Sequence, residues 1–187
     1  MKRTIIILLV LLLSGSFCSS YGQLYFTKNG RLSFFSKTSL ENISADNNQV
    51  LSVLNVQTGV LQFSVLNNAF YFPKAKMQED FNENYMESDK YPKSTFKGLV
   101  TDIGTINLST DGNYKMQVKG DLTIHGVTKN ITASGTLIIK NGNISATASF
   151  KILLTDYRIK IPTIVTDKIA KEIEVTVNCI YEKKSSN

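Results

Sequence analysis

The feature that most constrains this chain is a strict alternation of apolar and polar residues over long segments. From Tyr114 to Ile124 the even-numbered residues are apolar or glycine, and the odd-numbered residues are polar or charged. Because successive side chains of a strand point to opposite faces, this period of two predicts a strand with one apolar face. The same pattern recurs over 131–139, 144–152 and 173–181.

Further strands and their connections follow from composition and turn signals. Segments rich in Val, Leu, Phe and Thr predict strands over 24–36, 48–57, 59–72 and 94–109. The pairs Asp111-Gly112 and Asn141-Gly142 are two-residue turn signals, and Gly126 marks a third turn. These turns predict an up-and-down order of strands over 105–110, 113–125, 128–140 and 143–155.

One segment departs from the alternation. Met77, Phe81 and Tyr85 are four residues apart, which predicts a short amphipathic helix over about 76–87, between Pro73 and Pro92. The acidic letters around it lack the spacing and the glycine turn of a calcium loop, so we interpret them as a solvated helix face. A second, weaker helix or a loop is expected at 162–169.

The apolar faces of these long strands need a common interior. A sheet that closes on itself removes its edges and encloses one face, and a barrel of about eight strands can hold one small ligand. The sequence therefore predicts an all-β fold: a lipocalin-like antiparallel barrel of about eight strands with one short helix, forming a single domain over 23–187.

The first 22 residues have the pattern of a secretory signal peptide. Lys2 and Arg3 precede an apolar run that is too short to span a bilayer, and small residues follow. We expect cleavage after Gly22 and no transmembrane segment afterwards, which predicts a periplasmic or secreted protein. Lipidation at Cys18 is the alternative, although Phe17 precedes it where a small residue is usual.

Charge and cysteine content argue against nucleic-acid binding and against an internal disulfide. Without Lys2 and Arg3 the chain has 19 basic and 15 acidic residues, which are dispersed and give no nucleic-acid footprint. Cys179 is then the remaining cysteine, so no internal disulfide is expected. It shares the parity of Val175 and Val177, which predicts a buried thiol that acts as a small hydrophobe.

The inward face combines small residues with uncharged larger ones. Small residues in mid-strand either leave volume for a long apolar guest or let a flattened barrel pack tightly, and the residues alone leave both readings open. On the first reading the candidate cavity-lining residues are Tyr114, Met116, Val118, Gly120, Leu122, Ile131, Ala133, Leu137, Ala146, Ala148, Phe150, Ile152, Val175 and Val177. Phe63, Phe70, Phe72 and Phe81 are expected in the core, with the pocket mouth as the alternative.

Catalytic and metal-binding patterns are missing from the sequence. His125 is the only histidine, and its parity places it with Lys119 and Thr123 on the polar outer face near a strand end. We expect a structural role at a turn; catalysis or contact with a ligand head group are the alternatives. One histidine and one cysteine cannot complete a zinc site. The chain is therefore predicted to be no enzyme and to need no cofactor.

Three segments resemble the YceI-like domain family. Residues 120–137 read GDLTIHGVTKNITASGTL, residues 77–98 read MQEDFNENYMESDKYPKSTFKG, and residues 156–184 read DYRIKIPTIVTDKIAKEIEVTVNCIYEKK. The resemblance implies a lipocalin-like barrel, exported to the periplasm, that holds a long polyisoprenoid or a similar amphiphilic lipid in its bore. It implies no catalysis.

The leading hypothesis is a secreted lipid-binding protein that holds a polyisoprenoid, such as a quinone, in an apolar cavity. The alternative is a barrel with a filled core whose outer surface recognises a protein or a glycan. The sequence leaves open whether the chain forms a homodimer.

Overall fold

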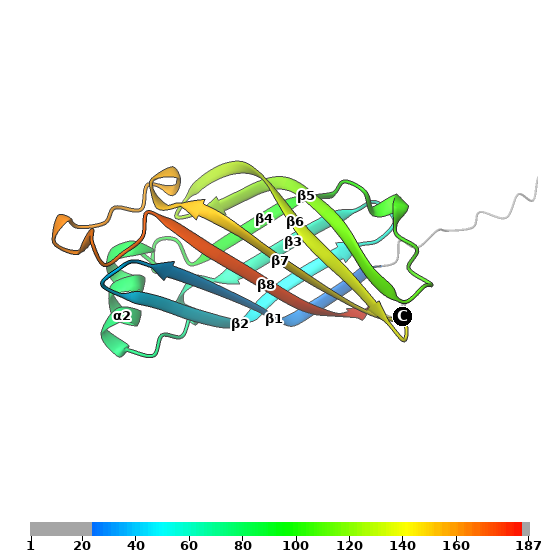
Figure 1. Cartoon of the computed structure of the whole chain (residues 1–187), viewed down its shortest axis with the longest axis horizontal. Coiled ribbons are helices and arrows are strands. Elements are labelled where there is room, and N and C mark those ends of the chain that lie inside the picture. Colours follow the sequence, from blue (N-terminus) through cyan, green and yellow to red (C-terminus); the bar gives the residue numbers. More distant parts are fainter. Residues whose placement is uncertain (1–23, 185–187) are drawn as a thin grey trace, which may run out of the picture.

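The structure is a computed structural model that describes residues 24–184. The predicted signal peptide and the alternative lipidation site at Cys18 lie outside the described residues. Eight antiparallel strands pair in sequence order and close into an elongated barrel, which confirms the predicted fold class (Figure 1). The strands are β1 (Leu24–Lys37), β2 (Asn42–Asn55), β3 (Val60–Leu66), β4 (Lys93–Val100), β5 (Gly112–Ile124), β6 (Val127–Lys140), β7 (Asn143–Leu153) and β8 (Glu172–Lys183).

The alternation of the sequence becomes the two faces of the barrel wall. In β5 the side chains of Met116, Val118 and Leu122 are buried, whereas Lys115 and Lys119 are exposed. Strands β5 and β6 pair without a bulge from Gly112 opposite Ile139 to Ile124 opposite Val127. An unbroken register keeps the same parity on the inner face along both strands, although Lys129, near the turn, is exposed.

Two hairpin turns have the geometry that the sequence predicts. Asn141 and Gly142 have φ values of 51° and 75°, and His125 and Gly126 have 50° and 72°. Both pairs place two successive residues in the left-handed region, as the two-residue turn between twisted strands requires. Asparagine and glycine adopt this region most readily, and histidine is among the few other residues enriched there.

The segment between β4 and β5 corrects two predictions. The strand expected over 94–109 ends at Val100, and the strand expected over 105–110 is a loop with the 3₁₀ turn η3 (Ile103–Thr105). The Asp102 carboxylate accepts a hydrogen bond from the Gln117 N–H at 3.2 Å, so a side chain takes the place of a strand partner. Asp111-Gly112 is therefore no hairpin turn, and Gly112 begins β5.

The strand predicted over 59–72 also ends early, at Leu66. Asn67 begins the 3₁₀ turn η1 (Asn67–Ala69), and its buried side chain bonds to neighbouring backbone and hydroxyl groups in place of a strand partner. Strand β2, by contrast, begins at Asn42, six residues before the predicted start at 48.

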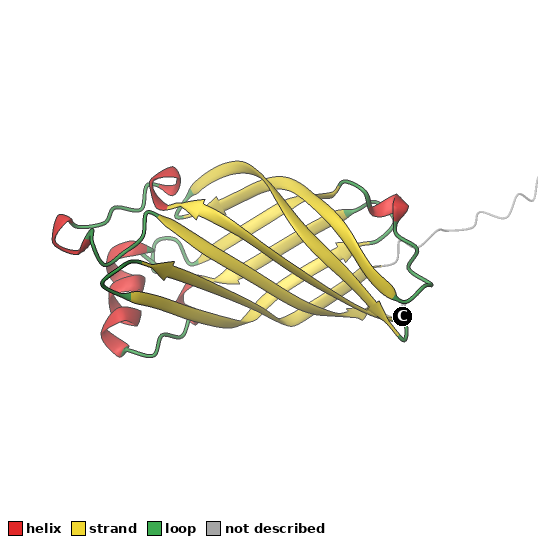
Figure 2. Ribbon diagram, viewed as in Figure 1, coloured by secondary structure: helices red, strands yellow, loops and turns green. Residues whose placement is uncertain are grey.

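Helical turns gather at the two ends of the barrel, as Figure 2 shows. The predicted helix is confirmed as α2 (Ala75–Asp80), which continues as the π-helical turn η2 (Phe81–Tyr85). We call this end the helix end. It also carries the β1–β2 turn and residues 154–171, here the 154–171 lobe (Figure 1), with η4 (Leu154–Tyr157) and η5 (Thr163–Val165).

The opposite end, here the loop end, is packed shut. Buried side chains from the β2–β3 turn, the β4–β5 loop and the ends of β6 and β7 fill it; they are Val56, Ile103, Ile106, Ile139 and Ile144. Within residues 24–184, no helix combines the length and the apolar character needed to cross a bilayer.

Candidate ligand-binding site

A cavity of about 410 Å³ lies inside the barrel, and all eight strands contribute to its wall. On β8 the lining residues extend from Ile173 to Tyr181, which corresponds to about 26 Å at about 3.3 Å per residue. The cavity is therefore long and narrow. Within residues 24–184 the barrel interior contains this cavity, which differs from the filled core that the alternative hypothesis requires.

Twelve of the fourteen predicted lining residues contribute to the cavity wall. They are Met116, Val118, Leu122, Ile131, Ala133, Leu137, Ala146, Ala148, Phe150, Ile152, Val175 and Val177. Tyr114 and Gly120 do not. Tyr114 lies near the loop end, where its hydroxyl donates a hydrogen bond to the Thr110 carbonyl at 2.9 Å. Whether the twelve residues contact a ligand stays a prediction.

The small residues of the inward face do not all leave space. A Cβ built on Gly120 would lie 2.4 Å from the Gly98 Cα and 2.8 Å from the Phe96 ring, so close strand packing and an aromatic ring use that volume. At Gly135 the Met116 side chain lies 3.1 Å from such a Cβ. The alanines at 133, 146 and 148 do line the cavity. Its width there is set by alanine and not by glycine.

The helix end of the cavity is aromatic. The rings of Phe34, Phe70, Phe72 and Phe81 form a cluster in which the paired centroids are 5.1 to 5.6 Å apart. Phe63, Phe70, Phe72 and Phe81 all belong to hydrophobic clusters, as expected, and all four also line the cavity. Phe34 was missed by the sequence analysis, although Leu32, Phe34 and Ser36 share one parity in β1.

The charged side chains of the lining gather at the helix end and mark the mouth. Glu41, Asp80 and Lys168 all line the cavity, and the Glu41 carboxylate accepts a hydrogen bond from Lys74 Nζ at 2.9 Å. This bond, with the charges of Lys74 and Lys168, lowers the pKa of Glu41. The lining is thus charged at one end and apolar along the bore, an arrangement suited to an amphiphile.

Asn67 is a fully buried polar residue beside the mouth. Its Nδ2 donates a hydrogen bond to the Tyr91 carbonyl at 2.6 Å, and the Asn47 Nδ2 donates separately to the Leu66 carbonyl at 2.8 Å. Ser94 Oγ donates to Asn67 Oδ1 at 2.9 Å. These bonds fix the chain that leads from β3 into the helix.

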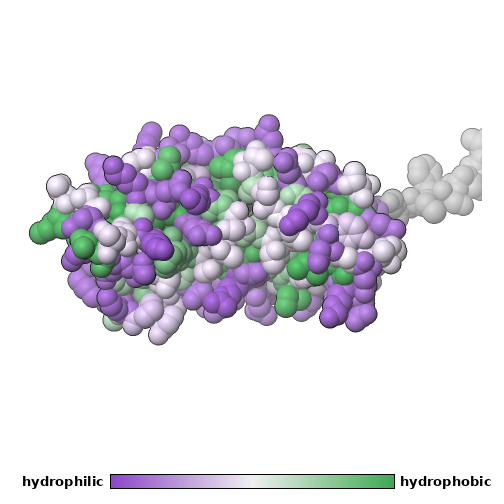
Figure 3. Space-filling model, viewed as in Figure 1, coloured by the Kyte–Doolittle hydropathy of each residue, from purple (hydrophilic) through white to green (hydrophobic). Residues whose placement is uncertain are grey.

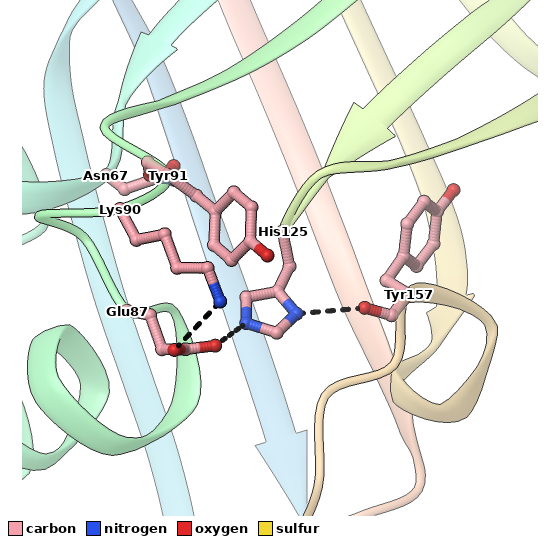
Figure 4. Close-up of polar contacts among 6 residues, drawn as sticks. All are labelled: Asn67, Glu87, Lys90, Tyr91, His125 and Tyr157. Atoms are coloured by element: carbon pink, nitrogen blue, oxygen red, sulfur yellow. Dashed lines mark hydrogen bonds and ion pairs between the residues drawn. The ribbon is translucent and has the colours of Figure 1, made fainter.

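His125 connects three segments at the helix end (Figure 4). Its Nε2 lies 2.7 Å from Glu87 Oε2, its Nδ1 lies 3.1 Å from the Tyr157 carbonyl oxygen, and its ring packs edge-on against Tyr91 at 4.6 Å. Carboxylates and carbonyls are acceptors, so both hydrogen bonds form together when each ring nitrogen carries a proton. The hydrogen bond from His125 lowers the pKa of Glu87.

This geometry corrects the predicted position of His125. The residue lies in the turn itself, so strand parity does not apply, and its side chain is only 11% exposed beneath Glu87. It does not line the cavity. The contacts support the structural role, because they join the β5–β6 turn to the end of the helical segment and to η4.

Polar groups are also buried in the barrel interior. The Ser52 and Tyr181 hydroxyls are 2.8 Å apart, and burial raises the pKa of Tyr181. Cys179 is a free, buried thiol, as predicted, and burial raises its pKa to about 11. Among residues 24–184, no three His, Cys, Asp or Glu side chains gather as a metal site.

Comparison with known proteins gives one family and several related folds. The model of the YceI-like domain matches residues 19–180. None of the curated proteins compared with the chain matches it.

The solved structures that resemble the barrel have low sequence identity. A polyisoprenoid binding domain from Saccharophagus degradans, implicated in plant cell wall breakdown, is 16% identical with a TM-score of 0.75, over 86% of this chain and 98% of that one. BcnA of Burkholderia cenocepacia is 14% identical with a TM-score of 0.67, over 82% and 96%. A YCEI protein of Campylobacter jejuni is 16% identical with a TM-score of 0.56, over 76% and 85%.

Proposed function

Because this chain belongs to the YceI-like domain family, we propose that it binds a long polyisoprenoid, such as a quinone, inside the barrel. The single observation that carries the proposal is the cavity: about 410 Å³, elongated, apolar along its length and charged at one end. The structural neighbour described as a polyisoprenoid binding domain supports the same class of ligand.

The shape of the cavity orients the ligand. The loop end is closed by packed isoleucine and valine side chains, whereas Glu41, Asp80 and Lys168 surround the mouth. The isoprenoid tail enters first and gains about 0.8 kcal/mol for each methylene-sized group that leaves water. The polar head stays at the mouth, where it can hydrogen bond to charged side chains or to water.

The lining favours storage or transport over chemical turnover. Cys179 is the thiol of the described lining, and its raised pKa of about 11 keeps it protonated near neutral pH. A protonated thiol is a poor nucleophile. His125, the other candidate for proton transfer, is bonded to Glu87 and Tyr157 and does not line the cavity.

We infer that the protein works outside the cytoplasm, from the signal-peptide pattern of its first 22 residues. The intact mass of the protein made by its own cells tests this inference. Cleavage after Gly22 gives a chain that begins at Gln23, lipidation gives an acylated chain that begins at Cys18, and an uncleaved chain contradicts export.

Ligand binding is tested by native mass spectrometry with isoprenoid quinones and alcohols of increasing chain length. We expect one ligand per chain, with an affinity that rises with each isoprene unit until the cavity is full and then levels off. A straight-chain alkyl series with the same head group is the control for nonspecific hydrophobic binding. The absence of a complex with any isoprenoid, or an affinity that does not depend on isoprenoid length, contradicts the proposal.

A further inference from the structure

We propose that the helix end docks on a lipid bilayer through Leu40 and Ile164, with the cavity mouth turned toward the membrane. The inference rests on the proposed function, because a carrier of an insoluble lipid needs a place to load it. It adds the surface at which loading occurs and the partner that this surface contacts.

The two side chains are among the most exposed large hydrophobic residues of the described chain. Ile164 in η5 is 86% exposed, and Leu40 in the β1–β2 turn is 63% exposed. Single exposed hydrophobic residues are common on soluble proteins. Each of these two lies on a loop at the mouth, next to a residue that lines the cavity: Leu40 precedes Glu41, and Ile164 precedes Val165. Figure 3 shows hydrophobic surface at the tip of the helix end.

The two loops are joined to each other and to the cavity. The Ala170 N–H donates a hydrogen bond to Ser36 Oγ at 2.9 Å, which fixes the 154–171 lobe against the end of β1. In the same lobe Val165 and Ile169 line the cavity, while the neighbouring Ile164 faces solvent. Apolar surface therefore continues from the bore across the lobe to its exposed tip.

The charge of the lobe complements lipid phosphates. Residues 154–171 contain four basic residues, Arg158, Lys160, Lys168 and Lys171, and two acidic residues, Asp156 and Asp167, for a net charge of +2. In the described part of the chain, none of the four cations forms a salt bridge. On the helix side of the mouth, Lys74 and Lys76 are paired with acids, so the lobe is the side that faces the membrane.

The size of the surface favours a bilayer over a second copy of the chain. A stable protein interface buries about 800 Å² on each partner, and two side chains on separate loops supply only a small part of that. A bilayer needs no complementary shape, because any apolar side chain that enters the interface gains free energy in proportion to its area. Weak docking of this kind suits repeated loading and release.

The sequence contains no tryptophan, so one introduced tryptophan reports on one position. Ile164→Trp is mixed with vesicles of phosphatidylcholine with one-fifth phosphatidylglycerol, and Ile180→Trp, 75% exposed on the β8 wall, is the matched control. We expect a blue shift of the emission for Ile164→Trp alone, reduced by added salt. Equal shifts, or no shift, at the two positions overturn the inference.

Loss of the side chains gives the second readout. Leu40→Ser with Ile164→Ser is expected to weaken vesicle co-sedimentation by roughly tenfold or more, whereas Ile180→Ser leaves it unchanged. The double variant should bind a quinone in solution as the parent does and take it up from vesicles more slowly. A concentration-dependent dimer that Ile164→Ser disperses contradicts bilayer docking.

The two proposals fail separately. A quinone complex without vesicle binding overturns the docking inference and leaves the proposed function intact. Vesicle binding without any isoprenoid complex overturns the proposed function, and the bilayer contact then stands on its own fluorescence result.

Discussion

Replacing Ala133 by leucine tests whether the bore is hollow. Ala133 lies on the inner face of β6, lines the cavity and is only partly buried, because open space lies beside it. Leucine adds three carbons to that space. If all three leave water in the empty protein, the gain is at most about 2.4 kcal/mol. In a filled core the same change overpacks and costs about 1–3 kcal/mol.

The same three carbons compete with the ligand. If they displace an equal length of isoprenoid from the bore, binding loses about 2.4 kcal/mol, or about 50-fold in Kd. Stability and affinity are therefore expected to change in opposite directions. A substitution that merely damages the fold would lower both stability and affinity. Opposite changes in the two quantities are therefore more informative than either change alone.

The assay combines thermal unfolding of the empty protein with titration of a quinone. For a domain of this size, each kcal/mol corresponds to about 2–4 °C in Tm, so Ala133→Leu is expected to raise Tm by a few degrees. Ser134→Leu is the matched control, since the adjacent side chain is exposed on the outer face. A lower Tm together with unchanged quinone affinity would refute the hollow-bore reasoning.

The remaining predictions concern polar contacts. His125→Asn, which tolerates the positive φ, should lower Tm, with about 1 kcal/mol from the lost Tyr157 carbonyl bond alone. Because His125 lowers the pKa of Glu87, that carboxylate stabilises the fold above its ordinary pKa of 4.5, and the difference between parent and variant should shrink as pH falls below it. Denaturation from pH 7 to 3 checks both. Tyr181→Phe leaves the buried Ser52 hydroxyl without its partner and should cost about 1–3 kcal/mol, while adding Ser52→Ala should recover part of the loss in urea titrations. Cys179, with a pKa of about 11, should react with a thiol reagent far more slowly than a free cysteine at pH 8, and equal rates would contradict its burial.

The barrel and much of its inner wall follow from the sequence because β5 to β8 alternate without interruption. Where the register is regular, as between Met116 and Leu122 on β5, one parity is inside for the whole strand. The two left-handed turns also follow from their residues, Asn141-Gly142 most directly. Neither feature depends on contacts between residues far apart in the chain.

The sequence does not show which interior volume is already used. Gly120 has the parity of a lining residue, yet Phe96 on the neighbouring strand covers it. Asp111-Gly112 has the sequence of a hairpin turn but does not form one. Both oxygens of the Asp111 carboxylate accept hydrogen bonds from the Asn141 N–H at 3.0 Å. In each case a partner distant in sequence decides the outcome.

The irregular alternation in the N-terminal half comes from two β-bulges between β1 and β2. Between Thr27 and Gly30 the chain of β1 has an extra residue relative to β2, and between Gly30 and Leu32 the extra residue lies in β2. Each bulge reverses the inward parity of its own strand. Buried positions change from Thr27 to Gly30 in β1, and from Asn47 to Val50 in β2.

The paired bulges explain how this half still builds the mouth. Because the two insertions lie on opposite strands, they cancel, and the pairing continues in register from Leu32 opposite Asn47 to Lys37 opposite Asn42. Gly30 fits at the junction because a Cβ there would lie 2.9 Å from the Cys179 Sγ. Without the β1 bulge, Leu32 and Phe34 would face solvent and the aromatic end of the cavity would lose its wall. The mouth therefore depends on a local irregularity that the alternation of apolar and polar residues does not predict.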